Sequence, residues 1–233
     1  MDAYPPQSPP GVSTAAERAP RSFGEIIREL PSQYRHVLTH PSAATFAEEM
    51  GKATWGSVWL QLLGWGVISA ILAAVGRLIS PLPIMTPANT GNLSPETLQT
   101  ITNVASFSGL SIGTLLGIPL SFFISMGILY LIAKAFRGQG TFLTQSYTSV
   151  LFQAPLGIAS SILNVIPYLG LISFAVFIYG IVLQVFAIMA AHRLSGGKAT
   201  LVVLLPALVV AILLFVLVLA FISVALILIG INR

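Results

Sequence analysis

The second half of this chain consists of long apolar stretches without acidic residues. Glu96 is the last acidic residue, and residues 97–233 contain no Asp or Glu. Across the chain 55% of residues are hydrophobic and 8% are charged, whereas ordinary soluble domains have about 25% charged residues. So few charges cannot cover the surface of a soluble domain, and the sequence therefore predicts an integral membrane protein surrounded by lipid.

Together with one apolar stretch in the first half, the chain has five stretches long enough to cross a bilayer as helices, which takes about 20 residues. They predict an all-α fold, a polytopic membrane bundle of about five transmembrane helices. Pro119 and Pro155 lie inside the second and third spans, where they predict a kink or a packed neighbour. The predicted spans are approximately 54–79, 107–133, 146–166, 168–191 and 201–231.

The amino-terminal part divides into a tail and a cytoplasmic segment ahead of the membrane domain at 54–233. Residues 1–21 are rich in proline and lack a hydrophobic period, which predicts a partly disordered tail and no cleavable signal peptide. Residues 22–53 form the cytoplasmic segment. Trp55 and Trp59 follow it, at the boundary where indole rings prefer to lie.

A short amphipathic helix is predicted at the start of the cytoplasmic segment. Ser22 and Glu25 have the spacing of a capping box, and Pro31 is expected to end the helix. Its apolar positions recur at helical spacing and comprise Phe23, Ile26, Ile27 and Leu30. This face has three possible partners, namely the membrane surface, another protein or the chain's own helices. A second short helix, on the surface, is predicted at 95–105 after Ser94.

The basic residues predict the orientation of the spans. The amino-terminal segment carries five Lys or Arg residues, and two further loops carry two each, comprising Lys134 with Arg137 and Arg193 with Lys198. Five spans place all three basic regions on one side of the membrane. The positive-inside rule then predicts a cytoplasmic amino terminus and a carboxyl terminus outside. Positive charges at span ends set topology, so we expect no nucleic-acid partner.

Catalytic and metal-binding signals are weak. Gly109, Ser111 and Gly113 match G-x-S-x-G, but they start a hydrophobic span, and His192 has no carboxylate to orient it. The repeat of Gly109, Gly113 and Gly117 instead predicts a helix-packing face. His36 and His40 are four residues apart, but the HExxH glutamate is missing and the chain has no cysteine. We therefore expect no enzyme, no metal and no cofactor.

Neutral amides are the polar side chains inside the predicted spans, namely Gln61, Gln153, Asn164 and Gln184. Such amides often form hydrogen bonds across helices. They can also line a polar pathway, so a small channel or transporter remains an alternative function.

The order of several segments resembles the Yip domain family, whose eukaryotic members are named for interacting with Ypt/Rab GTPases. The matching segments are HPSAATF (40–46), RGQGTFLTQSYTSVLFQAPLG (137–157), NVIPYLGLI (164–172) and AAHRLSGGKAT (190–200). The residues that carry the resemblance are Gly138, Gly140, Phe142, Pro155, Pro167, Gly170, His192, Gly197 and Lys198.

The resemblance implies a cytoplasmic amino-terminal segment, five spans and a carboxyl terminus on the far side. Eukaryotic members often carry Asp-Leu-Tyr-Gly-Pro before span one, whereas ATWGSVW (53–59) lacks the Asp and the Pro. The pattern is closer to bacterial members, which implies a bacterial cytoplasmic membrane. The expected function is membrane organisation or recruitment of a protein partner by the amino-terminal segment, with homo-oligomers possible. Arg137 and Lys198 are candidates for contact with anionic lipid headgroups.

Overall fold

The protein is an assembly of α-helices in the computed structural model, which describes residues 22–79, 94–166 and 169–231. Within these ranges every regular element is helical. The helices are α1 (Phe23–Thr39), α2 (Ala43–Met50), α3 (Trp55–Ile79), α4 (Pro95–Ala135), α5 (Phe142–Val165), α6 (Gly170–His192) and α7 (Gly196–Ile231). The predicted proline-rich tail at 1–21 lies outside the described residues.

Five of these helices are long and apolar enough to cross a membrane. The apolar segments are Trp55–Gly76, Gly113–Ala135, Phe142–Val165, Leu171–His192 and Gly196–Leu219. This confirms the predicted all-α membrane bundle with five spans. Most of their surface lies outside the protein core, as expected for helices whose apolar side chains contact lipid.

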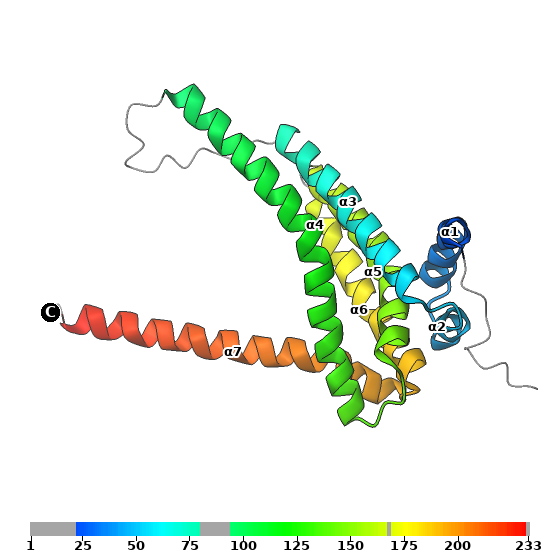
Figure 1. The fold of residues 1–233 in the computed structure, drawn as a ribbon. Coiled ribbons are helices and arrows are strands. Elements are labelled where there is room, and N and C mark those ends of the chain that lie inside the picture. Colours follow the sequence, from blue (N-terminus) through cyan, green and yellow to red (C-terminus); the bar gives the residue numbers. More distant parts are fainter. Residues whose placement is uncertain (1–21, 80–93, 167–168, 232–233) are drawn as a thin grey trace, which may run out of the picture.

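Helix α5 lies at the centre of the bundle. It packs between α3 and α6, and α4 packs along α3 and also contacts α5 (Figure 1). Every residue from Gln145 to Phe152 is buried, including four polar ones. Helices α1 and α2 pack against α5 and α6. The amino-terminal segment is therefore part of the folded bundle.

Helix α7 leaves the bundle after its first turns and projects away from it (Figure 1). Its early residues contact α6 and α4, whereas residues 207–219 are all exposed. Because this stretch is uniformly apolar, lipid is the solvent that its side chains require.

Two helices extend further than the sequence predicts. Helix α1 continues past Pro31 to Thr39, although proline removes one intrahelical hydrogen bond. The turns after Pro31 are held by tertiary contacts, because Gln33 and Val37 are buried against the bundle. The predicted surface helix at 95–105 is the beginning of α4, which runs without a break to Ala135. Its cap at Ser94 is as predicted.

Candidate functional site

The ends of α4 and α6 meet the start of α5 in a tight polar contact, which we call the helix-end junction. It consists of residues 136–141, residues 191–194 and Gln145. The Gln139 N–H donates to the His192 carbonyl at 3.1 Å and joins the two loops. A Cβ atom at Gly138 would lie 2.7 Å from His192 Nδ1, and one at Gly140 would overlap the Ala191 carbonyl. Glycine is therefore required here by close approach of the backbone.

His192 is fully buried in this junction, at 0% exposure. Its Nε2 lies 2.7 Å from Gln145 Oε1, and because an amide oxygen only accepts, Nε2 carries the proton. Gln145 Nε2 in turn donates to the Met126 carbonyl at 2.9 Å. Nδ1 has no hydrogen-bond partner among the described residues. This arrangement ties α4, α5 and α6 together and brings no carboxylate to the histidine.

Two arginines of the junction have a left-handed backbone conformation. Arg137 has a φ of 66° and Arg193 a φ of 54°, at positions after helix ends where glycine is usual. Both are exposed, as are Lys134 and Lys198. The four described cations of the membrane domain beyond residue 94 thus lie near the carboxyl ends of α4 and α6 and the start of α7.

A second set of polar contacts lies deeper in the bundle, between α5 and α6. Gln153 Nε2 donates to Gln184 Oε1 at 2.8 Å, and Gln184 Nε2 donates to Ser149 Oγ at 3.0 Å. These bonds cross from one helix to the other, in the way expected of amides inside a membrane. We call this set the amide ladder.

The amide ladder borders a hollow between α3, α5, α6 and α7 with a volume of about 320 Å³. Its lining includes the aromatic side chains of Trp65, Phe152 and Phe177 together with Gln153, Ser160 and Gly180. Trp65 lies directly over Gly157, where a Cβ atom would overlap the indole ring. The hollow lies between α3, α5 and α6 at positions within their apolar segments, where lipid is the expected solvent.

Two tyrosines anchor the amino-terminal segment to the bundle. Tyr147 Oη donates to Gln33 Oε1 at 3.2 Å, and Tyr179 Oη donates to the Leu38 carbonyl at 2.5 Å. Phe46 packs edge-on against Phe152, with the ring centroids 6.0 Å apart.

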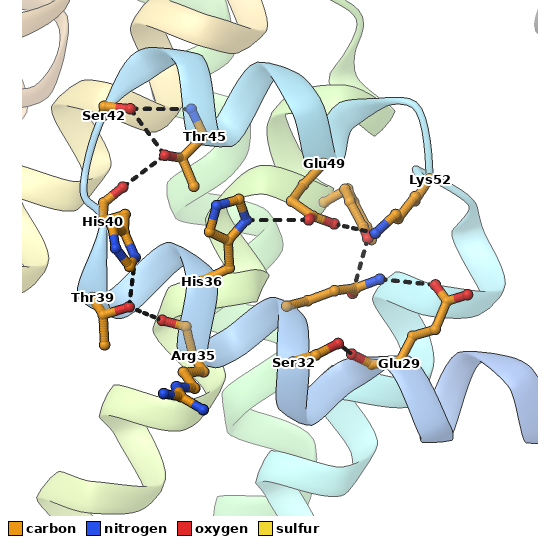
Figure 2. Close-up of polar contacts among 12 residues, drawn as sticks. Glu29, Ser32, Arg35, His36, Thr39, His40, Ser42, Thr45, Glu49 and Lys52 are labelled. Carbon is orange, nitrogen blue, oxygen red and sulfur yellow. Dashed lines mark hydrogen bonds and ion pairs between the residues drawn. The ribbon is translucent and has the colours of Figure 1, made fainter.

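The segment itself is closed by polar contacts that Glu49 of α2 makes with α1 and with the residues after α2 (Figure 2). Glu49 is 6% exposed, and its carboxylate lies 2.9 Å from Lys52 Nζ and 3.6 Å from His36 Nδ1. His40 does not continue the helix, as Pro41 predicts, and its ring lies 5.8 Å from that of His36. Burial also raises the pKa of Tyr34 well above its ordinary value, which keeps the phenol neutral.

The predicted amphipathic face of α1 is divided by the fold. The predicted capping box of Ser22 and Glu25 is present. Ile26 and Leu30 are half-buried, whereas Phe23 is 64% and Ile27 48% exposed. The first turns of α1 thus present apolar side chains beyond the part that packs on the bundle.

The structure brings some predicted family-motif residues together and leaves others apart. Gly138, Gly140 and His192 meet in the helix-end junction, and Phe142 packs against Tyr130 with ring centroids 5.5 Å apart. The others are separate. Pro155 lies within α5, Gly170 starts α6, Gly197 and Lys198 are exposed at the start of α7, and Pro167 lies outside the described residues.

Two of the predicted packing glycines face open space among the described residues. A Cβ atom at Gly113 or Gly117 would meet no described atom within 4 Å. The surroundings of Gly109 and the side chain of Ser111 lie outside what the structure describes. Close helix contact instead occurs at Gly66, where a Cβ would lie 3.4 Å from Leu115, and at Gly157. Single glycines of this kind have no sequence signature that distinguishes them.

Comparison with known protein families gives one match that covers most of the chain. Residues 35–220 match the family model described as the Yip1 domain. This range includes α2 to α6, the later part of α1 and most of α7. No curated protein and no solved structure matches the chain.

Proposed function

The chain belongs to the Yip1 domain family, and on this premise we propose that it is a non-enzymatic membrane protein that recruits a protein partner through α1. Phe23 and Ile27 carry this proposal, because they are large apolar side chains exposed on a helix outside the five spans. Apolar side chains that project from an anchored helix are suited to a groove on a partner.

The anchoring of α1 supports recruitment because it fixes the position of these side chains. The later turns of α1 are held by Tyr147 and Tyr179, which come from two different spans. A recognition helix on a rigid frame loses less conformational entropy on binding than a free tail does. The membrane domain would then serve to hold this helix at a defined place on the bilayer surface.

The same proposal includes an orientation and a location. We place the amino terminus in the cytoplasm and the carboxyl terminus outside, in a bacterial cytoplasmic membrane. The clustering of Lys134, Arg137, Arg193 and Lys198 supports this orientation, because cations are retained on the cytoplasmic side. Contact of these cations with anionic headgroups would add to the attraction.

Proximity labelling from the amino terminus of the full chain, in native membranes, tests the recruitment. The variant carries Phe23→Ser and Ile27→Ser, and the control carries Gly24→Ser, at a neighbouring position open to solvent. We expect the control to label the same proteins as the parent chain and the double variant to lose a defined subset. Identical labelling by all three chains would contradict recruitment through α1.

A small channel or transporter is the second candidate, and one feature of α5 favours it. Polar or small residues recur at every fourth position along this helix, at Gln145, Ser149, Gln153, Gly157 and Ser161. Such a row winds gradually around the helix and could border a neutral path for a solute. Solute flux in liposomes that is lost in Gln153→Leu would favour this function over recruitment.

A further inference from the structure

We propose that the hollow beside the amide ladder binds a neutral, single-chain amphiphile with a hydroxyl group, of the long-chain alcohol class. This site is separate from the α1 surface and does not depend on the proposed recruitment. Its volume of about 320 Å³ falls within the range of roughly 300–1,000 Å³ typical of small-molecule sites.

Unused hydrogen-bonding groups in the wall point to a polar group on the occupant. Within the described residues Gln153 makes one side-chain hydrogen bond, from Nε2 to Gln184, which leaves its Oε1 free. The indole N–H of Trp65 and the hydroxyl of Ser160 make none with any described residue. Polar groups that face lipid without a partner are costly, so each of these favours an occupant able to bond with it.

A hydroxyl group matches this set better than a carbonyl group or an ionic group does. A hydroxyl can donate, as an unpaired Gln153 Oε1 requires, and can also accept, as the Trp65 indole N–H requires. A carbonyl group could only accept, and would leave Gln153 Oε1 without a donor. No charged side chain is among the described residues that line the hollow, so an ionic headgroup would lie there without a counter-charge.

The depth of the site restricts the occupant further. Gln153 is eleven residues after Phe142, the first residue of α5, which is about 16 Å along the helix. A bilayer core is about 30 Å thick, so the amide lies near its middle. The headgroup of a phospholipid stays at the interface and cannot reach this depth. A small amphiphile that enters the hollow whole can do so.

Trp65 provides the readout. With Trp55→Phe and Trp59→Phe, the full-length protein in phosphatidylcholine liposomes keeps Trp65 as its single tryptophan. The probes are a chain-brominated long-chain alcohol, the brominated alkane of the same length and a chain-brominated phosphatidylcholine. We expect the alcohol to quench Trp65 fluorescence saturably. The concentration of alcohol that gives half of the maximal quenching should be about fivefold below that of the alkane, since one hydrogen bond gives a difference of that order.

Three substitutions in this background make the test specific. Gly180→Leu places a side chain in the hollow, and a Cβ at Gly180 would make only an ordinary 3.7 Å contact with Leu156. This variant should abolish saturable quenching by both single-chain probes. Gln153→Leu should reduce the advantage of the alcohol over the alkane, because it removes one of the two groups that can bond with the hydroxyl. Gly117→Leu, at an open position outside the lining, is the control and should change neither.

Several outcomes would overturn the proposal. Equal quenching by alcohol and alkane in the parent protein would show that the hollow is filled by any apolar chain. Quenching by the brominated phosphatidylcholine at the same concentration as the alcohol would assign the hollow to bulk lipid. An unchanged preference for the alcohol in Gln153→Leu would also contradict it, and this result can be read even if Gly180→Leu does not fold.

Discussion

At the scale of single residues, close approach of the backbone decides which positions are irreplaceable. The helix-end junction brings Gly138 and Gly140 against the last turn of α6. A Cβ atom added at either glycine would collide with atoms of Ala191 or His192. The opposing atoms include a backbone carbonyl, which cannot move aside as a flexible side chain does. These glycines therefore set the distance between α4, α5 and α6.

Gly140→Ala tests this directly. The added methyl group must displace the Ala191 carbonyl, and overpacking of this kind costs about 1–3 kcal/mol. We expect the thermal unfolding midpoint of the detergent-solubilised protein to fall by several degrees. Gly127→Ala is the matched control, because its Cβ would meet no described atom within 4 Å and alanine is the better helix former. Equal midpoints for the two variants would show that the Ala191 carbonyl can move aside for a methyl group at residue 140 without loss of stability.

The sequence made part of this junction predictable and left part of it hidden. Gly138, Gly140 and His192 are found from their family-like loops. Their mutual contact depends on how α4 and α6 end side by side, which local patterns do not encode. Gln145 and Tyr147 were not predicted as buried contact residues, because polar residues at the start of an apolar helix usually indicate an interface with water. The spacing of four residues between Gln145, Ser149 and Gln153 was the available signal for a packed face.

At the scale of helices, tertiary contacts override local breakers. Pro31 predicts the end of α1 from backbone chemistry alone, yet the helix continues to Thr39. The reason is that Gln33 and Val37 lie in the bundle, where their burial offsets the lost backbone hydrogen bond. The presence of five long apolar helices, in contrast, was predictable, because the length and hydropathy that mark a helix able to cross a membrane are properties of the local sequence.

Tyr179→Phe should loosen the attachment of α1 while leaving the spans intact. The variant loses the 2.5 Å hydrogen bond to the Leu38 carbonyl and leaves that acceptor unpaired. One such bond contributes about 1 kcal/mol, so local opening of the segment should become roughly fivefold more frequent. Trypsin cleavage after Arg28 and Arg35, followed by mass spectrometry, should accelerate by the same factor.

Tyr130→Phe is the control for this measurement, because the Tyr130 hydroxyl makes no hydrogen bond to any described residue. Its cleavage rate should equal that of the parent chain. Equal acceleration in both variants, or none in Tyr179→Phe, would mean that the tyrosine hydroxyl does not hold α1 on the bundle.

At the scale of the whole molecule, charge and polarity are separated along the chain. The acidic residues all precede residue 97, and the exposed cations of the later helices gather at the ends of α4 and α6 and the start of α7. Helix α7 then continues for 36 residues without an acidic residue, mostly outside the bundle (Figure 1). Charged contacts are therefore confined to the amino-terminal segment and these helix ends, whereas the apolar helices are suited to lipid.

The chain has no cysteine, so single introduced cysteines can report the side on which each loop lies. Glu96, Gln139 and Ser195 are exposed at the start of α4, between α4 and α5, and between α6 and α7. If α4, α5 and α6 each cross once, a membrane-impermeant maleimide should label Gln139→Cys and Ser195→Cys from the same side, and Glu96→Cys from the other. Labelling of Gln139→Cys and Ser195→Cys from opposite sides would remove one crossing and with it the five-span arrangement. If Glu96→Cys shared the side of Gln139→Cys, α4 would not span the bilayer despite its 41 residues.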